Sequence, residues 1–321
     1  MLTRRLLLAA LPASVAVTGA QAAPDSFAAF LASLRQQARH AGIAAATLDH
    51  ALTGLTPNQA VLKREQHQPE FTMTWARYRN LLVTGKRIDE GVAAYRQSRT
   101  VFAAVRQRYA VDPGIIAGIW GLESSYGTKM GDFRVVDALA TLAWATSRRR
   151  FFSSELLAAL KILQHGDTTA ARMTGSYAGA MGQPQFMPTS YLRYAVDFTG
   201  SGRRDIWTSV PDVLASIGNY LAQSGWRGGQ SWGQPVALPA GFHGQSGRDH
   251  HRPLSAWAAM GLRPMARRWK AMGNAPAALL LPDGPQGDAF LVYANFAAIR
   301  RYNPSDFYAL AVGLLGDAIV A

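Results

Sequence analysis

Glu123 is the acidic residue whose position in the sequence best suits acid–base chemistry. Trp120, Ile119 and Ile116 lie three, four and seven residues before it, so in a helix its carboxylate shares a face with apolar side chains. Desolvation and the negative end of a helix dipole both raise the pKa of a carboxyl group in such a place. A carboxylic acid that stays protonated near neutral pH can protonate a leaving oxygen. The same spacing also fits a glutamate that caps a helix or forms an ion pair at its end.

The flanking sequence supplies the helix that would position this carboxylate. Asp112-Pro113 is typical of an N-cap followed by proline at the first helical position. Gly127 is typical of a residue that ends a helix. Together they predict a helix over Gly114–Ser124, with Glu123 in its last turn.

Glu123 also belongs to one of four sequence blocks that occur in a fixed order. The blocks are Gly121–Gly127 (GLESSYG), Asp137–Leu142 (DALATL), Gly175–Tyr191 (GSYAGAMGQPQFMPTSY) and Arg301–Pro304 (RYNP). The first resembles the E-S-x-x-G signature of goose-type lysozymes and lytic transglycosylases. Together the four resemble the lytic murein transglycosylase B family, from about Phe27 to the C-terminus.

The resemblance implies cleavage of the β-1,4 bond between N-acetylmuramic acid and N-acetylglucosamine in peptidoglycan. One glutamate acts first as an acid and then as a base, and the muramoyl 6-hydroxyl closes onto C1 to leave a 1,6-anhydro end. Ordinary glycosidases need two carboxylates at set distances. The next acids after Glu123 are Asp132, Asp137 and Glu155, and none lies in a recognisable partner motif, which suits a mechanism with one carboxylate.

The resemblance also implies a set of substrate-binding residues. Ser176 and Gln185 match residues that hold the glycan by hydrogen bonds, and Phe186 matches an apolar wall beside them. The remaining matches are aromatic or amide side chains that suit sugar faces and hydroxyl groups: Tyr302, Asn303, Tyr308, Tyr78 and Tyr220. Ordinary core packing is the alternative interpretation of each tyrosine.

Three other functions remain open on the sequence. A muramidase would admit water and leave a reducing sugar. A non-catalytic peptidoglycan-binding protein would not need the intact motif around Glu123. Nucleic-acid binding rests on the positive charge alone and conflicts with the N-terminal sequence described below.

Helical periodicity extends over most of the chain and predicts a mainly α (α+β) protein. Short apolar runs bounded by Gly and Pro predict strands between Gln230 and Asn295, interrupted by a helix over Leu254–Met260. With the resemblance, this predicts a lysozyme-like helical catalytic core with additional N-terminal helices and a small β lobe. The expected parts are a signal peptide (1–22) and a catalytic region (23–321), the latter comprising a helical flanking part (23–110), a core (111–229), a β lobe (230–295) and a C-terminal helix (296–321). Other expected helices are Ile88–Tyr109, Val135–Ala145, Phe152–Gln164, Pro211–Ala222 and Pro304–Ile319, and Thr174–Pro188 is expected to be a loop.

The segment Asp197–Thr208 resembles the EF-hand-like calcium loop of some family members. Such loops need oxygen ligands at alternate positions and a bidentate acid at position 12. Position 12 here is Thr208, and two arginines balance the two acids of the loop. We therefore expect no tight calcium site and no other cofactor, and we expect Arg203 or Arg204 to pair with Asp197 or Asp205. His250-His251 has no second ligand pair at useful spacing, which predicts exposed histidines and no metal.

The composition and the N-terminus indicate an exported protein. Thr3-Arg4-Arg5, an apolar run and Ala20-Gln21-Ala22 form the three regions of a signal peptide, of the general or the twin-arginine type. The net charge of 33 − 20 = +13 becomes 13 − 2 = +11 after removal of residues 1–22, which contain two arginines and no acid. A basic exported protein is expected to meet an anionic wall polymer, so the predicted location is periplasmic. The chain has no cysteine, which excludes a lipid anchor on cysteine, thiolate metal sites and a cysteine nucleophile. The expected partners are peptidoglycan strands and cell-wall synthases.

Overall fold

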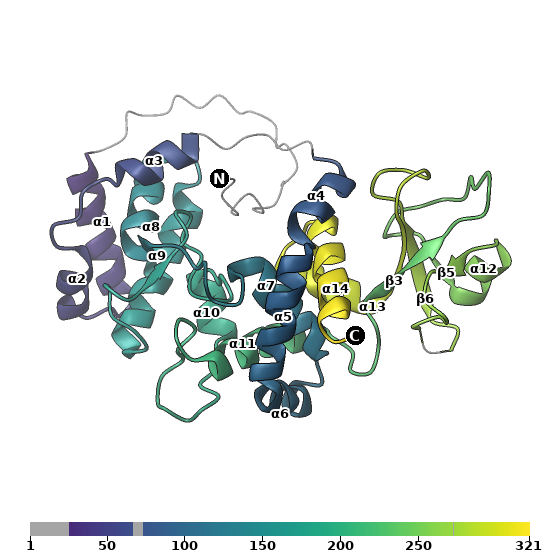
Figure 1. Ribbon diagram of the computed structural model, residues 1–321. Coiled ribbons are helices and arrows are strands. Elements are labelled where there is room, and N and C mark those ends of the chain that lie inside the picture. Colours follow the sequence, from purple (N-terminus) through teal and green to yellow (C-terminus); the bar gives the residue numbers. More distant parts are fainter. Residues whose placement is uncertain (1–25, 67–72, 272) are drawn as a thin grey trace. The chain divides into compact units, whose positions relative to one another are not determined.

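The computed structural model describes residues 26–66, 73–271 and 273–321 (Figure 1). The expected signal peptide, residues 1–22, lies outside the described residues. Among the described residues, no helix is long and apolar enough to cross a membrane.

The chain forms two compact units, and each combines separated stretches of sequence. The first unit contains the described residues of 26–66 and 123–217, and the second those of 73–122 and 218–321. Helices α7 (Pro113–Ser124) and α11 (Val210–Gln223) each begin in one unit and end in the other. The expected division into consecutive segments stays a prediction.

The first unit is built around α8 and α9, which pack against each other through long apolar faces. Side chains tie the N-terminal helices to this pair: Gln164 Oε1 of α9 accepts from Ala44 N at 2.6 Å, and Thr141 Oγ1 of α8 accepts from Asn58 N at 3.0 Å. The elements that lie wholly in this unit are α1 (Phe27–His40), α2 (Ala45–Leu52), α3 (Gln59–Gln66), β1 (Phe133–Arg134), α8 (Val135–Ala145), α9 (Arg149–His165), β2 (Thr174–Gly175) and α10 (Pro188–Tyr194).

The second unit surrounds α14 with helices. Both α4 and α5 contact α14, and α7 approaches it so closely that a Cβ on Gly118 would lie 2.5 Å from the carbonyl oxygen of Val312. The small residues of α7 therefore let two helix backbones touch. The helices that lie wholly in this unit are α4 (Trp75–Leu82), α5 (Gly85–Gln97), α6 (Arg99–Tyr109), α12 (Leu254–Ala259), α13 (Ala294–Tyr302) and α14 (Asp306–Ile319).

The second unit also contains an antiparallel five-stranded sheet in the order β4-β6-β7-β3-β5. Its own apolar cluster includes Trp257 of α12 and Leu279 and Leu291 of the central strands, all fully buried. The strands are β3 (Gly233–Ala237), β4 (His251–Pro253), β5 (Arg263–Pro264), β6 (Pro276–Leu280) and β7 (Ala289–Val292).

A mainly helical protein with a small sheet confirms the predicted fold class. Two predicted helices are each two helices in the structure. Ile88–Tyr109 is divided at Ser98, which ends α5 and begins α6. The segment 296–321 contains the end of α13 and all of α14, because Asn303 precedes a proline and is extended, at φ −147° and ψ 123°.

Candidate active site

Glu123 lies in the last turn of α7, a helix that is buried along almost its whole length. Gly114 N donates to Asp112 Oδ1 at 2.8 Å, so the predicted N-cap is present. Ile116, Ile119 and their apolar neighbours on α7 are inaccessible to solvent. Glu123 is the single ionisable side chain within Pro113–Ser124 and is half-buried. The structure thus fixes its backbone tightly while leaving part of its side chain accessible.

The chain reverses directly after Glu123, and the E-S-x-x-G residues form this turn. Ser124 Oγ accepts from Gly127 N at 3.0 Å, while Ser125 and Tyr126 adopt left-handed φ values of 49° and 57°. Gly127 has φ 87°, and a Cβ there would lie 2.6 Å from Gln183 Oε1. The signature therefore specifies a helix end on which a second segment, the one containing Gln183, can pack.

That second segment is the predicted loop, and its backbone folds tightly upon itself. Ser176 N donates to Ala180 O at 2.7 Å, and Ala180 N donates to Ser176 Oγ at 2.8 Å. Gly175 lies so close to the carbonyl of Ala180 that no Cβ would fit. Ser176 is 3% exposed, so its hydroxyl has a fixed position within this turn. The loop prediction is correct except that its first two residues form β2 and its last residue, Pro188, begins α10.

Gln185 connects this loop to the segment after the α7 turn. It has a left-handed φ of 53°, and its Nε2 donates to Gly182 O at 2.7 Å and to Met130 O at 2.9 Å. The side chain is half-buried. Phe186 is 2% exposed, so its ring is held by packing. Within the first unit, the structure therefore brings together the end of α7, which carries Glu123, and the loop that carries Ser176 and Gln185.

Two of the other acids named on the sequence, Glu155 and Asp137, have structural contacts of their own. Glu155 is 3% exposed, and its two oxygens accept from Thr189 N at 2.9 Å and Thr189 Oγ1 at 2.7 Å, at the start of α10. Burial raises the pKa of Glu155 even though these hydrogen bonds oppose the rise. Burial likewise raises the pKa of Asp137, against the effect of Arg134.

The remaining site residues predicted on the sequence belong to the second unit, where two of them form an aromatic pair. The rings of Tyr220 and Tyr302 lie 4.7 Å apart, and the Tyr220 hydroxyl donates to the carbonyl of Arg301. Both side chains are half-buried.

Asn303 and Tyr308 lie around the start of α14. Asn303 Oδ1 accepts from Ser305 N at 3.1 Å, and Ser305 Oγ accepts from Tyr308 N at 3.3 Å. Tyr308 is fully buried. Tyr78 on α4 lies against other rings, with centroids 6.2 Å from Trp75 and 5.7 Å from Phe307.

The transglycosylase SLT domain family model matches residues 26–317. The chain belongs to this transglycosylase family. It is 37% identical over 293 residues to the membrane-bound lytic murein transglycosylase B of Escherichia coli, a match that covers 89% of this chain and 78% of the relative.

The structure of this chain is also similar to solved structures of lytic transglycosylases. SltB3 from Pseudomonas aeruginosa, in complex with NAG-anhNAM-pentapeptide, has a TM-score of 0.87 at 46% identity, covering 92% of this chain and 80% of SltB3. The Escherichia coli lytic transglycosylase SLT35 in complex with calcium has a TM-score of 0.76 at 30% identity, covering all of this chain and 98% of that one.

The two carboxylates of loop 197–208, which resembles a calcium loop, accept hydrogen bonds from the loop's own backbone. Asp197 accepts from Ser201 N at 3.0 Å and Gly202 N at 2.7 Å. Asp205 accepts from Trp207 N and Thr208 N, at 2.9 and 2.8 Å. Desolvation acts to raise the pKa of both carboxyl groups, but these hydrogen bonds outweigh it and lower each pKa. Among the described residues, no group of three or more His, Cys, Asp or Glu side chains could hold a metal. The expected absence of a tight calcium site stays a prediction.

Loop 197–208 is held in place by two carboxylates, Asp212 and Asp167, that the sequence analysis did not identify. Asp212, fully buried in the first turn of α11, accepts from Phe198 N at 2.9 Å and Asp205 N at 3.0 Å. Asp167 accepts from Arg204 Nη2 at 2.6 Å. Arg204 thus pairs with Asp167, which follows α9, and not with Asp197 or Asp205, whereas the positive charge of Arg203 acts on Asp205. An acid in the first turn after Ser209 is a signal that could have identified Asp212.

His250 and His251 are exposed, as predicted, and His251 begins β4.

Proposed function

We propose that this transglycosylase cleaves the β-1,4 bond between N-acetylmuramic acid and N-acetylglucosamine, with Glu123 as its single acid–base residue. The observation that carries the proposal is the half-buried carboxylate of Glu123 at the end of an otherwise apolar helix. The negative end of the α7 dipole favours its protonated form.

In the proposed reaction, Glu123 first donates one proton and later accepts another. The Glu123 carboxyl group gives its proton to the glycosidic oxygen as the bond from that oxygen to C1 breaks. The carboxylate then takes the proton of the muramoyl 6-hydroxyl as O6 bonds to C1. The glutamate ends protonated, as it began, and no water is consumed.

Two arms of one experiment test this reaction. Replacing Glu123 with Gln should lower kcat by about 10²–10⁴-fold, the usual contribution of a general acid–base group. Glu90→Gln is the matched control, because Glu90 is an exposed glutamate of α5 that is paired with Lys86. Mass spectrometry of digested sacculi should show 1,6-anhydro ends. Hydrated muramic ends would instead identify a muramidase, and unchanged solubilisation by E123Q would reject Glu123 as the catalytic residue.

We propose that Ser176, Gln185 and Phe186 hold the glycan within the first unit. The supporting observation is that the backbone turns described above fix the Ser176 hydroxyl and the Gln185 amide. Within the second unit, we propose that Tyr78, Tyr220, Tyr302 and Asn303 bind sugar, because rings and an amide suit sugar faces and hydroxyl groups. Tyr308 is fully buried and offers no surface to a glycan, so its predicted role in substrate binding is wrong. Tyr302→Phe should raise KM with little change in kcat, whereas equal losses in kcat and kcat/KM would indicate contact in the transition state only.

We propose further that the protein works in the periplasm after removal of residues 1–22. Sequencing the N-terminus of the protein isolated from the cell envelope tests this. Cell-wall synthases are proposed partners, because cutting and building of strands must coincide, and cross-linking in intact cells tests that association.

A further inference from the structure

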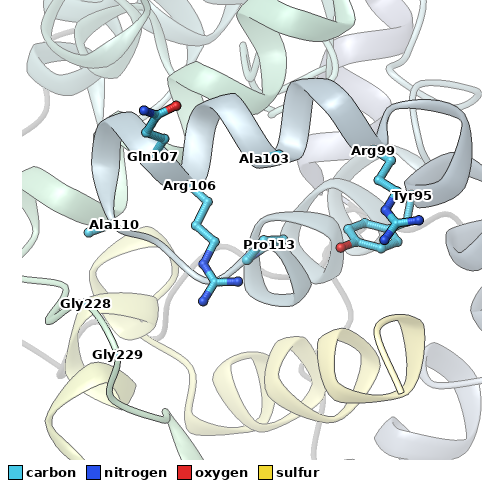
Figure 2. Close-up of a pocket in the computed structure, with 9 residues that line it drawn as sticks. All are labelled: Tyr95, Arg99, Ala103, Arg106, Gln107, Ala110, Pro113, Gly228 and Gly229. Carbon is cyan, nitrogen blue, oxygen red and sulfur yellow. The ribbon is translucent and has the colours of Figure 1, made fainter.

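A cleft in the second unit is lined by two arginines and contains no acid among its lining residues. Its volume is about 450 Å³, and its walls come from α5 and α6, the first residue of α7 and a Gly-Gly loop (Figure 2). The lining residues include Tyr95, Arg99, Ala103, Arg106, Gly228 and Gly229.

The charge of this cleft is not neutralised within the described part of the chain. The guanidinium groups of Arg99 and Arg106 form no ion pair or hydrogen bond with any residue that the structure describes. Arg204, by contrast, pairs with Asp167 at 2.6 Å, and Arg148 lies 4.7 Å from the ring centroid of Phe151. The nearby carboxylate of Asp112 is outside the lining and caps α7 through Gly114 N. The cleft therefore presents two available guanidinium groups.

The spacing of the two arginines suits an extended ligand. They are seven residues apart on α6 and so share one face, about 10 Å apart along the helix axis at ~1.5 Å per residue. Ala103 between them contributes only a methyl group, and Gly228 and Gly229 contribute no side chain to the opposite wall. Figure 2 shows Arg99 beside the ring of Tyr95 and Arg106 extending toward Pro113. The guanidinium groups of Arg99 and Arg106 at the two ends of the cleft suit a ligand with two anionic groups joined by a narrow chain.

We propose that this cleft binds the acidic stem peptide of peptidoglycan, at a place separate from Glu123. Three residues of an extended peptide cover about 10 Å, so two carboxylates near the ends of such a span can each meet one guanidinium, and Arg binds carboxylates with paired hydrogen bonds. Pro113 and Glu123 are ten residues apart on α7, about 15 Å along its axis. The cleft thus holds a peptide away from the bond that is cut. The choice of peptidoglycan as the ligand rests on the proposed function, whereas the evidence for an anion site is the cleft itself.

Calorimetric titration with a free stem tripeptide (Ala–Glu–diaminopimelate) tests the site without any turnover. The double variant Arg99→Gln, Arg106→Gln should bind at least about tenfold more weakly, with about three- to tenfold for each single variant. The matched control is Arg267→Gln, Arg268→Gln, which removes the same charge from two exposed arginines outside the cleft. This control should bind as the wild type does, and the tripeptide with its carboxylates amidated should bind as weakly to the wild type as the acid does to the double variant.

Activity supplies a second readout with the full-length mature enzyme. The double variant should show a raised KM on intact sacculi and unchanged activity on glycan strands from which an amidase has removed the peptides. No tripeptide binding by the wild type, equal loss in the control pair, or equally tight binding of inorganic phosphate would overturn the peptide site. Failure of the proposed function is distinct, because it would appear as missing anhydro ends whatever the tripeptide does.

Discussion

Gly118→Ala is predicted to destabilise the protein through the contact between α7 and α14. A methyl group at this position would lie 2.5 Å from Val312 O and 3.3 Å from Gly316 N, both backbone atoms of α14. Since neither atom is the end of a flexible side chain, one helix must shift. Forcing an extra methyl group into a packed interior costs about 1–3 kcal/mol, while exchanging Gly for Ala within a helix gains about 1 kcal/mol.

Gly85→Ala separates these two effects. Gly85 begins α5, and a Cβ there would have no atom within 4 Å, so this variant shows the helix gain without the clash. Most of the helix gain is common to both variants. The difference between their free energies of unfolding therefore reports the steric cost at Gly118, about 1–3 kcal/mol.

Thermal unfolding of both variants, followed by circular dichroism, measures that difference. Because α7 carries Glu123, Gly118→Ala should also lower kcat, whereas Gly85→Ala should not. Equal midpoints for the two variants would refute the reasoning, since the methyl group would then be accommodated without displacement of either helix.

Three further predictions concern the carboxylates of the first unit. Burial raises the pKa of Glu155 above its ordinary 4.5, so Glu155 stabilises the folded state below that pH, and this stabilisation is lost as the pH rises through the raised pKa. The thermal midpoint of the wild type minus that of Glu155→Gln should therefore decrease from pH 4 to pH 8. A constant difference between the two midpoints would contradict this prediction. Asp212→Ala leaves Phe198 N and Asp205 N without their acceptor and should cost about 2–5 kcal/mol in the unfolding free energy, with a smaller cost for Asp212→Asn, which keeps one oxygen. Millimolar calcium should leave the thermal midpoint unchanged, and micromolar binding by calorimetry would reject this prediction.

Local sequence signals were sufficient for the helix that carries Glu123. Its N-cap, its first proline and its apolar face all lie within a few residues, so Pro113–Ser124 was predicted to within one residue of the observed bounds. The four ordered blocks were sufficient for the family, because the Gly and Ser residues in them fix turns that other residue types could not adopt. Gly127, against Gln183, is such a position.

The features that the sequence did not predict depend on residues far apart in the chain. The partner of Arg204 is Asp167, 37 residues earlier, and sequence proximity favoured the nearer acids. The arginine cleft needs residues 95–113 and 228–229 to meet, which no local pattern indicates. Ser98 divides α5 from α6 although the apolar periodicity continues through it, because periodicity reports which face is buried and not whether the backbone bends.

The contacts of Glu155 argue against a role for this residue as a second catalytic carboxylate. An acid that served as nucleophile or base would need an oxygen directed at substrate, yet both Glu155 oxygens accept hydrogen bonds from Thr189 and orient the start of α10. Releasing them would leave a buried carboxylate with fewer partners, at a cost of several kcal/mol. The carboxylate of Glu123, by contrast, ends a helix whose other side chains cannot titrate. Glu155 holds the start of α10, whereas Glu123 lies half-buried at the end of an apolar helix. This difference is the structural reason for our proposal that Glu123 carries out both proton transfers.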